Sequence, residues 1–154
     1  MAHLSLNAMI NAPVDQVFAL ATDLSRAAEY IDGIDQIEIL TEGPIGVGTK
    51  WRETRTMFGK QATETLDITG FQPPLDVNSP ASYTAECESC GCHFVSEFQF
   101  HPAAEGTHVE LQLTTRPITL FAKLLSPLTA LTMGACKKAM EQDLANLKRA
   151  AESA

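Results

Sequence analysis

Apolar and polar residues alternate over most of the chain before Pro117, which is the pattern of strands that have one buried face. The predicted strands cover residues 4–10, 36–41, 49–58, 61–69, 82–88, 92–100 and 107–115. From Pro117 onward the apolar residues recur every three or four positions, the spacing of one helix face. This stripe runs through Phe121, Leu125, Leu128, Thr132, Cys136, Met140, Asp143/Leu144 and Leu147. Pro127 interrupts the run, so we predict a short helix over 119–125 and a long helix over 127–151.

Two short helices are predicted between the first two strands. Pro13 suits the first turn of a helix, and an apolar stripe of helical spacing follows it. This stripe consists of Val14, Val17, Phe18 and Ala21. A second short helix is expected at about 24–30. Hairpin connections make the sheet mainly antiparallel, and a long helix can bury only one stripe, so we predict an α+β fold with the sheet curled around the C-terminal helix.

The hairpin of residues 49–69 combines apolar and charged residues on its inward face. A two-residue turn at Gly59-Lys60 would place Arg55 directly opposite Glu64. Buried charges need a partner or water, so we predict an Arg55–Glu64 pair that leaves Glu53 to bind a ligand hydroxyl or act as a base. The alternative is a purely structural ion pair or a wet pocket floor. The apolar members of this face are Trp51, Met57, Leu66 and Ile68.

A second hairpin supplies most of the aromatic residues expected on the inner wall. A turn at Cys90-Gly91 pairs Tyr83 with Phe98 and matches the two apolar faces. The further inward residues are Phe94, Ser96 and Phe100, with Val109, Leu111, Leu113 and Thr115 on the last strand. A tyrosine that faces a carboxylate could serve in acid–base chemistry.

Three cysteines and a histidine lie within seven residues and resemble a metal-binding cluster. Cys87, Cys90, Cys92 and His93 could supply four ligands to zinc. Alternation along the hairpin, however, directs Cys87 and Cys92 inward and His93 outward, and a second ligand pair at a distance is missing. We therefore predict no metal and no cofactor. Whether Cys87 and Cys92 form a disulfide under oxidising conditions is left open, and free thiols are the default expectation.

The length, the hydrophobic content and the net charge limit the number of domains and the classes of partner that the chain can have. The 154 residues predict one domain, 1–154, and 45% hydrophobic content is enough for a sizeable core. A net charge of −8 argues against nucleic acid and anionic membrane surfaces, since both attract a basic face. No apolar run is long enough to span a membrane, and the first residues lack the pattern of a signal peptide, so a cytoplasmic location is expected.

Four segments in this order carry a family resemblance. They are Ile10–Phe18, Asp23-Leu24 with Tyr30, Gly43–Trp51 and Asp143–Lys148. Together they make the chain resemble the START/Bet v 1-like (SRPBCC) superfamily, and within it the bacterial polyketide cyclase/dehydrase and lipid-transport family. The resemblance implies a helix-grip fold, in which a curved seven-stranded antiparallel sheet holds a long C-terminal helix and a cavity for hydrophobic small molecules lies between them.

This resemblance leaves the activity open because the family has no universal catalytic motif. The leading hypothesis is a small cytoplasmic protein that binds a hydrophobic or aromatic, lipid- or polyketide-like molecule. One alternative is a cyclase/dehydrase-type enzyme that uses Glu53, Arg55, Glu64 and Tyr83, and another is a protein-interaction module; a homodimer is also left open. The expected ligand-binding residues are Trp51, Glu53, Arg55, Met57, Glu64, Leu66, Tyr83, Phe94, Ser96, Phe98, Leu111 and Leu128, with Leu124 and Thr132 helping to close the cavity.

Overall fold

The fold is a single antiparallel sheet with a long helix on one face. The computed structural model describes residues 1–125, 127 and 129–154, and their side chains apart from those of 129, 130 and 132. The strands are β1 (Ala2–Ile10), β2 (Ile34–Ile39), β3 (Lys50–Met57), β4 (Lys60–Gln72), β5 (Ala81–Ser89), β6 (Cys92–Ala103) and β7 (Gly106–Pro117). The helices are α1 (Val14–Ala21), α2 (Ala27–Tyr30), α3 (Leu120–Leu124) and α4 (Thr129–Ser153). The predicted element order is confirmed.

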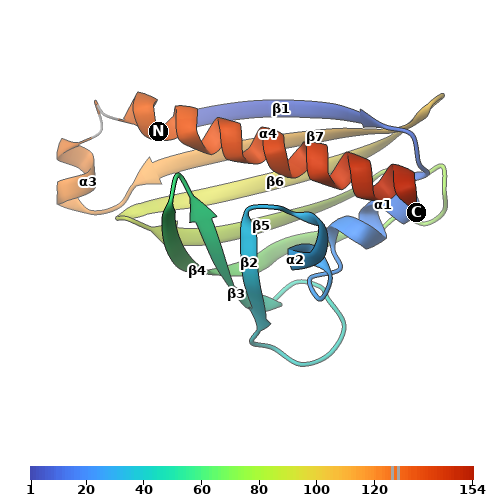
Figure 1. The fold of residues 1–154 in the computed structure, drawn as a ribbon, viewed down its shortest axis with the longest axis horizontal. Helices are drawn as coiled ribbons and strands as arrows, with labels where there is room; N and C mark the ends of the chain where they lie inside the picture. The colour runs from blue at the N-terminus through green and yellow to red at the C-terminus, as the bar shows by residue number, and fades with distance from the viewer. Residues whose placement is uncertain (126, 128) are drawn as a thin grey trace.

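The sheet has the strand order β1-β7-β6-β5-β4-β3-β2 and curves around α4 (Figure 1). Helices α1 and α2 lie near the C-terminal end of α4, and α3 lies at the opposite end of the molecule (Figure 1). This arrangement is the predicted helix-grip fold. Within the described residues, no helix combines the length and the apolar character that crossing a bilayer requires.

The main core lies between α1, the C-terminal half of α4 and the part of the sheet formed by β1, β7 and β6. Phe18 of α1 packs at ring-centroid distances of 5.4 Å from Phe71 and 5.5 Å from Phe100. Helix α4 buries Leu144, Leu147 and Ala151, each 5% exposed, against this cluster. The apolar stripe of α4 therefore fixes its C-terminal half to the sheet, as its spacing predicts.

The first part of the C-terminal helical run differs from the prediction. Phe121 and Leu125 belong to the stripe predicted to be buried, but they are 71% and 42% exposed. Leu124 is predicted to close the cavity, but α3 turns away from it and leaves this side chain 71% exposed. The predicted positions of Leu128 and of the Thr132 side chain lie outside the described residues.

The register of the β3–β4 hairpin is shifted by two residues from the prediction. Met57 pairs with Lys60, so the turn consists of Phe58 and Gly59 rather than Gly59 and Lys60. Both turn residues have positive φ, 53° and 77°, as a type I′ turn requires, and this turn matches the twist of the strands. Arg55 consequently pairs with Ala62, and Glu53 faces Glu64. A shift of two keeps every side chain on its predicted face because the strand repeat is also two.

The β5–β6 hairpin has the predicted register. Cys87 pairs with Phe94 and Tyr83 pairs with Phe98. Its turn residues, Cys90 and Gly91, have φ angles of 52° and 75°, the same geometry as in the β3–β4 turn. The inward positions of β7 are also as predicted, with Val109, Leu111, Leu113 and Thr115 at most 5% exposed.

Gly106, at the start of β7, packs against the segment that joins β1 to α1, and substituting it tests this contact. Its φ is 136°, and an added Cβ would collide with the Ile10 carbonyl oxygen and lie 2.8 Å from the Ala12 nitrogen. We expect Gly106→Ala to lower the free energy of unfolding by roughly 2–4 kcal/mol, measured by urea titration. Gly46→Ala is the matched control because an added Cβ there meets no atom within 4 Å. Equal stability of the two variants would refute this packing.

Candidate functional site

A cavity of about 290 Å³ lies between the sheet and α4. Its wall contains eleven of the twelve side chains predicted to bind a ligand. These are Trp51, Glu53, Arg55, Met57, Glu64, Leu66, Tyr83, Phe94, Ser96, Phe98 and Leu111. The twelfth, Leu128, lies outside the described residues. The structure thus brings the predicted set together, and their binding of a ligand stays a prediction.

Each part of the wall follows from a local feature of the fold. Strands β3 to β7 contribute their inward-facing positions, which the alternation of the sequence identifies. Helix α4 contributes Cys136, Ala139, Met140 and Asp143 from the face turned toward the sheet. The end formed by α2 and β2 adds Tyr30, Ile34 and Ile37, which sequence reasoning missed. The short α2 has too few residues for a clear apolar period, so its face could not be assigned.

An ion-pair network on the cavity wall joins β3 to α4. The Nη1 and Nη2 atoms of Arg55 donate hydrogen bonds to the two carboxylate oxygens of Asp143, at 3.1 Å and 2.7 Å. Its Nε donates to Glu53 Oε2 at 2.6 Å. The side chains of Arg55, Glu53 and Asp143 are 23%, 14% and 24% exposed. This two-point geometry fixes the guanidinium in one orientation.

The predicted Arg55–Glu64 pair is wrong. In the observed register Glu64 faces Glu53 rather than Arg55, and the partner of Arg55 comes from α4 instead. The sequence held a signal for this partner, since Asp143 is a carboxylate on the otherwise apolar stripe of the last helix. A partly buried acid on that stripe and a partly buried arginine on the facing sheet each need a partner of opposite charge.

Burial and charge shift the pKa values of the network. Burial lowers the pKa of Arg55, but the hydrogen bonds and charges of Asp143 and Glu53 outweigh it and raise the pKa above its ordinary value. Burial raises the pKa of Asp143, an effect that Arg55 opposes and Glu53 reinforces. Arg55 therefore stays charged, and its one positive charge is shared by two carboxylates.

Two tyrosines place phenol groups beside this network. Burial is the main cause that raises the pKa of Tyr83 well above 10.0, with further contributions from Tyr30, Glu53 and Asp143. Burial likewise raises the pKa of Tyr30, whose hydroxyl donates to the Leu20 carbonyl oxygen at 3.2 Å. The Tyr83 ring stacks on Phe98 at 4.6 Å, and its hydroxyl has no hydrogen-bond partner within the described part of the chain. A protonated phenol can therefore donate to a bound molecule here.

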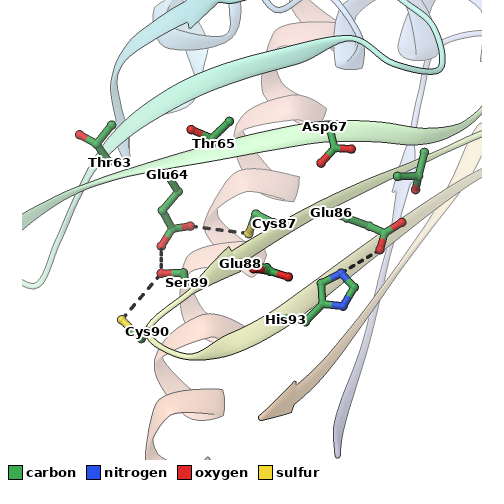
Figure 2. A pocket seen from close by; sticks show the side chains of 11 residues that line it. Thr63, Glu64, Thr65, Asp67, Glu86, Cys87, Glu88, Ser89, Cys90 and His93 are labelled. Carbon is green, nitrogen blue, oxygen red and sulfur yellow. Dashed lines mark hydrogen bonds and ion pairs between the residues drawn. The ribbon is translucent and has the colours of Figure 1, made fainter. Parts of the chain in front are cut away.

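Glu64 lies at a gap between two strands. Strands β4 and β5 are paired from Leu66–Cys87 to Gln72–Ser82. On the other side of the Leu66–Cys87 pair, toward Glu64 and Ser89, the two strands diverge (Figure 2). Glu64 accepts a hydrogen bond from Ser89 Oγ at 2.6 Å and a weaker one from Cys87 Sγ at 3.8 Å. Outside the gap lies a polar pocket of about 740 Å³, lined mainly by outward-facing residues of β4 and β5. Glu64 and Cys87 line both spaces, so their side chains form the partition between the pocket and the cavity.

The cysteine and histidine cluster does not converge. Cys87 faces the cavity, whereas His93 lies on the outer face and contacts Glu86 at 2.8 Å (Figure 2). Cys90 is exposed at the turn, and all four cysteines are free thiols. Among the residues that the structure describes, no group of three His, Cys, Asp or Glu side chains could hold a metal ion. Cys87 and His93 therefore lie on the faces that the alternation predicts.

A double-mutant cycle tests the network. Arg55→Gln and Asp143→Asn each leave a partly buried group without its charged partner, so each should lower the free energy of unfolding. We expect a coupling energy of roughly 1–3 kcal/mol between them, measured by urea titration of both single variants and the double variant. The control cycle of Arg55→Gln with Glu64→Gln should give less than about 0.5 kcal/mol. The reverse ranking would support an Arg55–Glu64 pair instead.

Thiol reactivity tests the partition. Burial, followed by the charges of Glu64 and Glu53, raises the pKa of Cys87 to about 12. The reactive thiolate is then scarce at pH 8 and increases as the pH rises toward the pKa. A variant that keeps only Cys87 should react with iodoacetamide about 100-fold more slowly at pH 8 than one that keeps only Cys90, and its rate should rise about tenfold per pH unit. Equal rates, followed by mass spectrometry, would show that Cys87 is open to solvent.

Solved structures of other proteins share this fold. The chain is 22% identical to the protein TTHA0849 of Thermus thermophilus, covering 99% of this chain and 98% of that one with a TM-score of 0.76. It is 21% identical to the Zhui aromatase/cyclase of Streptomyces sp. R1128, covering 98% and 93% with a TM-score of 0.72. Ara h 8.0201 is 17% identical, covering 94% and 98% with a TM-score of 0.56. At these identities the likeness establishes the fold alone.

Sequence comparison assigns the family. No curated protein matches the chain. The family model described as polyketide cyclase/dehydrase and lipid transport matches residues 1–152. This match covers every residue that lines the cavity, since the lining runs from Ala21 to Leu147. The chain therefore belongs to the polyketide cyclase/dehydrase and lipid-transport family.

Proposed function

We propose that this protein binds a small hydrophobic or aromatic molecule, lipid- or polyketide-like, in the cavity between the sheet and α4. The observation that carries the proposal is the cavity itself, whose wall is mostly apolar and includes a few convergent polar groups. A protein that needed only a stable core would gain by filling this space, because unfilled volume lowers stability. A cytoplasmic location goes with this proposal.

The cavity volume limits the size of the ligand. A volume of about 290 Å³ lies just below the roughly 300–1,000 Å³ typical of ligand pockets. A compact molecule of a few rings fits this space better than a long acyl chain that must be fully enclosed. Stacked aromatic side chains, with Tyr83 and Phe98 at 4.6 Å, offer a flat surface for such rings.

The charges on the wall favour an uncharged ligand. Arg55 already binds two carboxylates, so a ligand carboxylate would meet the repulsion of Glu53 and Asp143 without gaining an unshared cation. The hydroxyl groups of Tyr83 and Ser96 line the same cavity and can donate to neutral oxygens. Ketones and phenols therefore suit the site better than free fatty acids.

Native mass spectrometry of protein purified from its own host is the direct test. We expect a discrete additional mass of a small apolar molecule in the native spectrum and its loss on denaturation. Ala139→Phe should abolish it, because residue 139 lines the cavity and a benzyl group fills it. Ala145→Phe is the matched control, since Ala145 lies on the same helix and is exposed.

The outcomes separate clearly. Loss of the ligand mass in Ala139→Phe and its retention in Ala145→Phe would support binding inside the cavity. Retention in both variants would place the ligand elsewhere and refute the proposal. Thermal denaturation of both variants, followed by circular dichroism, shows whether a loss reflects occupancy or unfolding.

A cyclase/dehydrase-type enzyme is the second candidate. It is favoured by the presence of Glu53, Arg55 and Tyr83 on the wall of one cavity, where an acid and a base can act on one substrate. The fold is shared with the Zhui aromatase/cyclase. Turnover of a poly-β-ketone substrate that Tyr83→Phe reduces without loss of binding would establish catalysis over simple carriage.

A further inference from the structure

Helix α3 lies at one end of the molecule (Figure 1). Its large apolar side chains are exposed. Leu120, Phe121, Leu124 and Leu125 are 77%, 71%, 71% and 42% exposed, and Leu131 of α4 is 78% exposed. Isolated exposed apolar residues are ordinary on protein surfaces, but several adjacent ones mark an interaction site. We call Leu120, Phe121, Leu124 and Leu125 the α3 face.

The α3 face is held outward by the way the helix is anchored. The backbone N–H groups of Ile118 and Thr119 donate to the Gly91 carbonyl oxygen at 2.8 Å and 3.2 Å. A Cβ added to Gly91 would lie 3.2 Å from the Ala122 Cβ, so the small side of α3 packs on the β5–β6 turn. Residues 120 and 124, like 121 and 125, are four apart and lie on one side of the helix. The larger side chains therefore project away from the protein.

The segment around the α3 face is basic although the chain is acidic. Residues 116–140 contain Arg116, Lys123, Lys137 and Lys138 but neither Asp nor Glu, which gives +4. The whole chain carries −8, so the remaining residues carry −8 − 4 = −12. All four basic side chains are exposed. Lys123 lies on α3 itself and Arg116 lies four residues before it, so both flank the α3 face, whereas Lys137 lies farther along α4 and pairs with Glu141 at 4.0 Å.

We propose that the α3 face docks on an anionic lipid bilayer. Exposed apolar side chains enter the interfacial region, and neighbouring Lys and Arg residues attract anionic headgroups, which is the combination found in interfacial helices. The acidic remainder of the chain is repelled by the same surface, so the protein is oriented with α3 toward the lipid. This proposal departs from the expectation drawn from the net charge of −8, because an average over the chain hides the local sign.

A second copy of the chain fits the α3 face less well. If the α3 faces of two copies met, two +4 segments would come together, so like charges would face each other at this interface. A bilayer of anionic lipid supplies the opposite charge and an apolar phase at the same surface. Self-association is therefore the competing outcome that the experiment must resolve.

Vesicle flotation of the full-length protein tests the docking. We expect binding to vesicles of phosphatidylcholine with about 30% phosphatidylglycerol, little binding to pure phosphatidylcholine, and loss of binding at high salt. The double variant Phe121→Ser/Leu124→Ser should weaken binding about tenfold or more, and Lys123→Glu should do likewise. The matched control is Leu75→Ser/Val77→Ser, whose residues are 95% and 49% exposed elsewhere on the surface.

Three results would overturn the proposal. They are absence of wild-type binding to the anionic vesicles, equal binding to both vesicle types, and equal loss in the control variant. Sedimentation velocity provides the competing readout, since a dimer that Phe121→Ser/Leu124→Ser converts to monomer would assign the α3 face to self-association instead. All substituted residues are exposed, so folding should be preserved, and circular dichroism verifies this. The test does not depend on any ligand in the cavity.

Discussion

The ion pair between Arg55 and Asp143 is the interaction on which the cavity depends. Helix α4 is packed at its C-terminal half, where Leu144, Leu147 and Ala151 lie in the core beside β1 and α1. Arg55 lies on β3, near the opposite edge of the sheet. A two-point ion pair therefore spans the concave face, and separating it would leave a poorly solvated charge on each side. Asn146, which is 1% exposed, makes a similar link by accepting from the Asp32 backbone N–H at 3.0 Å. Together these contacts hold α4 at a fixed height above the sheet, which leaves open space beneath Cys136–Met140.

Much of the cavity wall could be predicted from the sequence because strand alternation is insensitive to the error that occurred. The predicted turn lies one residue too far along the chain, which shifts every pair of the β3–β4 hairpin by two positions. The partner of Arg55 is therefore Ala62 rather than Glu64. The side chains predicted to face inward nevertheless do so, so the predicted wall residues are correct although the predicted cross-strand pairs are wrong. The cause was the turn chemistry: Gly59 was assigned to the first turn position, whereas the type I′ turn uses it at the second.

The features that sequence reasoning missed depend on contacts between distant elements. Asp143 and Arg55 are separated by 88 residues in the chain. The local pattern of apolar and polar residues does not indicate which strand lies opposite which turn of the last helix. Periodicity also identifies an apolar stripe through Phe121 and Leu125, but it does not indicate which element, if any, packs against that stripe. In the structure the stripe is divided, because α3 is anchored on the β5–β6 turn through Ala122 while α4 is anchored on the sheet through Leu144 and Leu147.

The distribution of charge links the two surfaces proposed here. The segment 116–140, whose charged residues are all basic, begins beside the α3 face and ends with Cys136, Ala139 and Met140 on the cavity wall. The same helix therefore presents cations at its outer surface and borders the apolar space on its inner one. If the acidic remainder orients the molecule, the end of the cavity nearest α3 is also the end nearest the bilayer. Asp143, which holds Arg55, lies farther along α4 than Cys136, Ala139 and Met140, so the ion-pair network lies farther from α3, and from the bilayer, than these wall residues do.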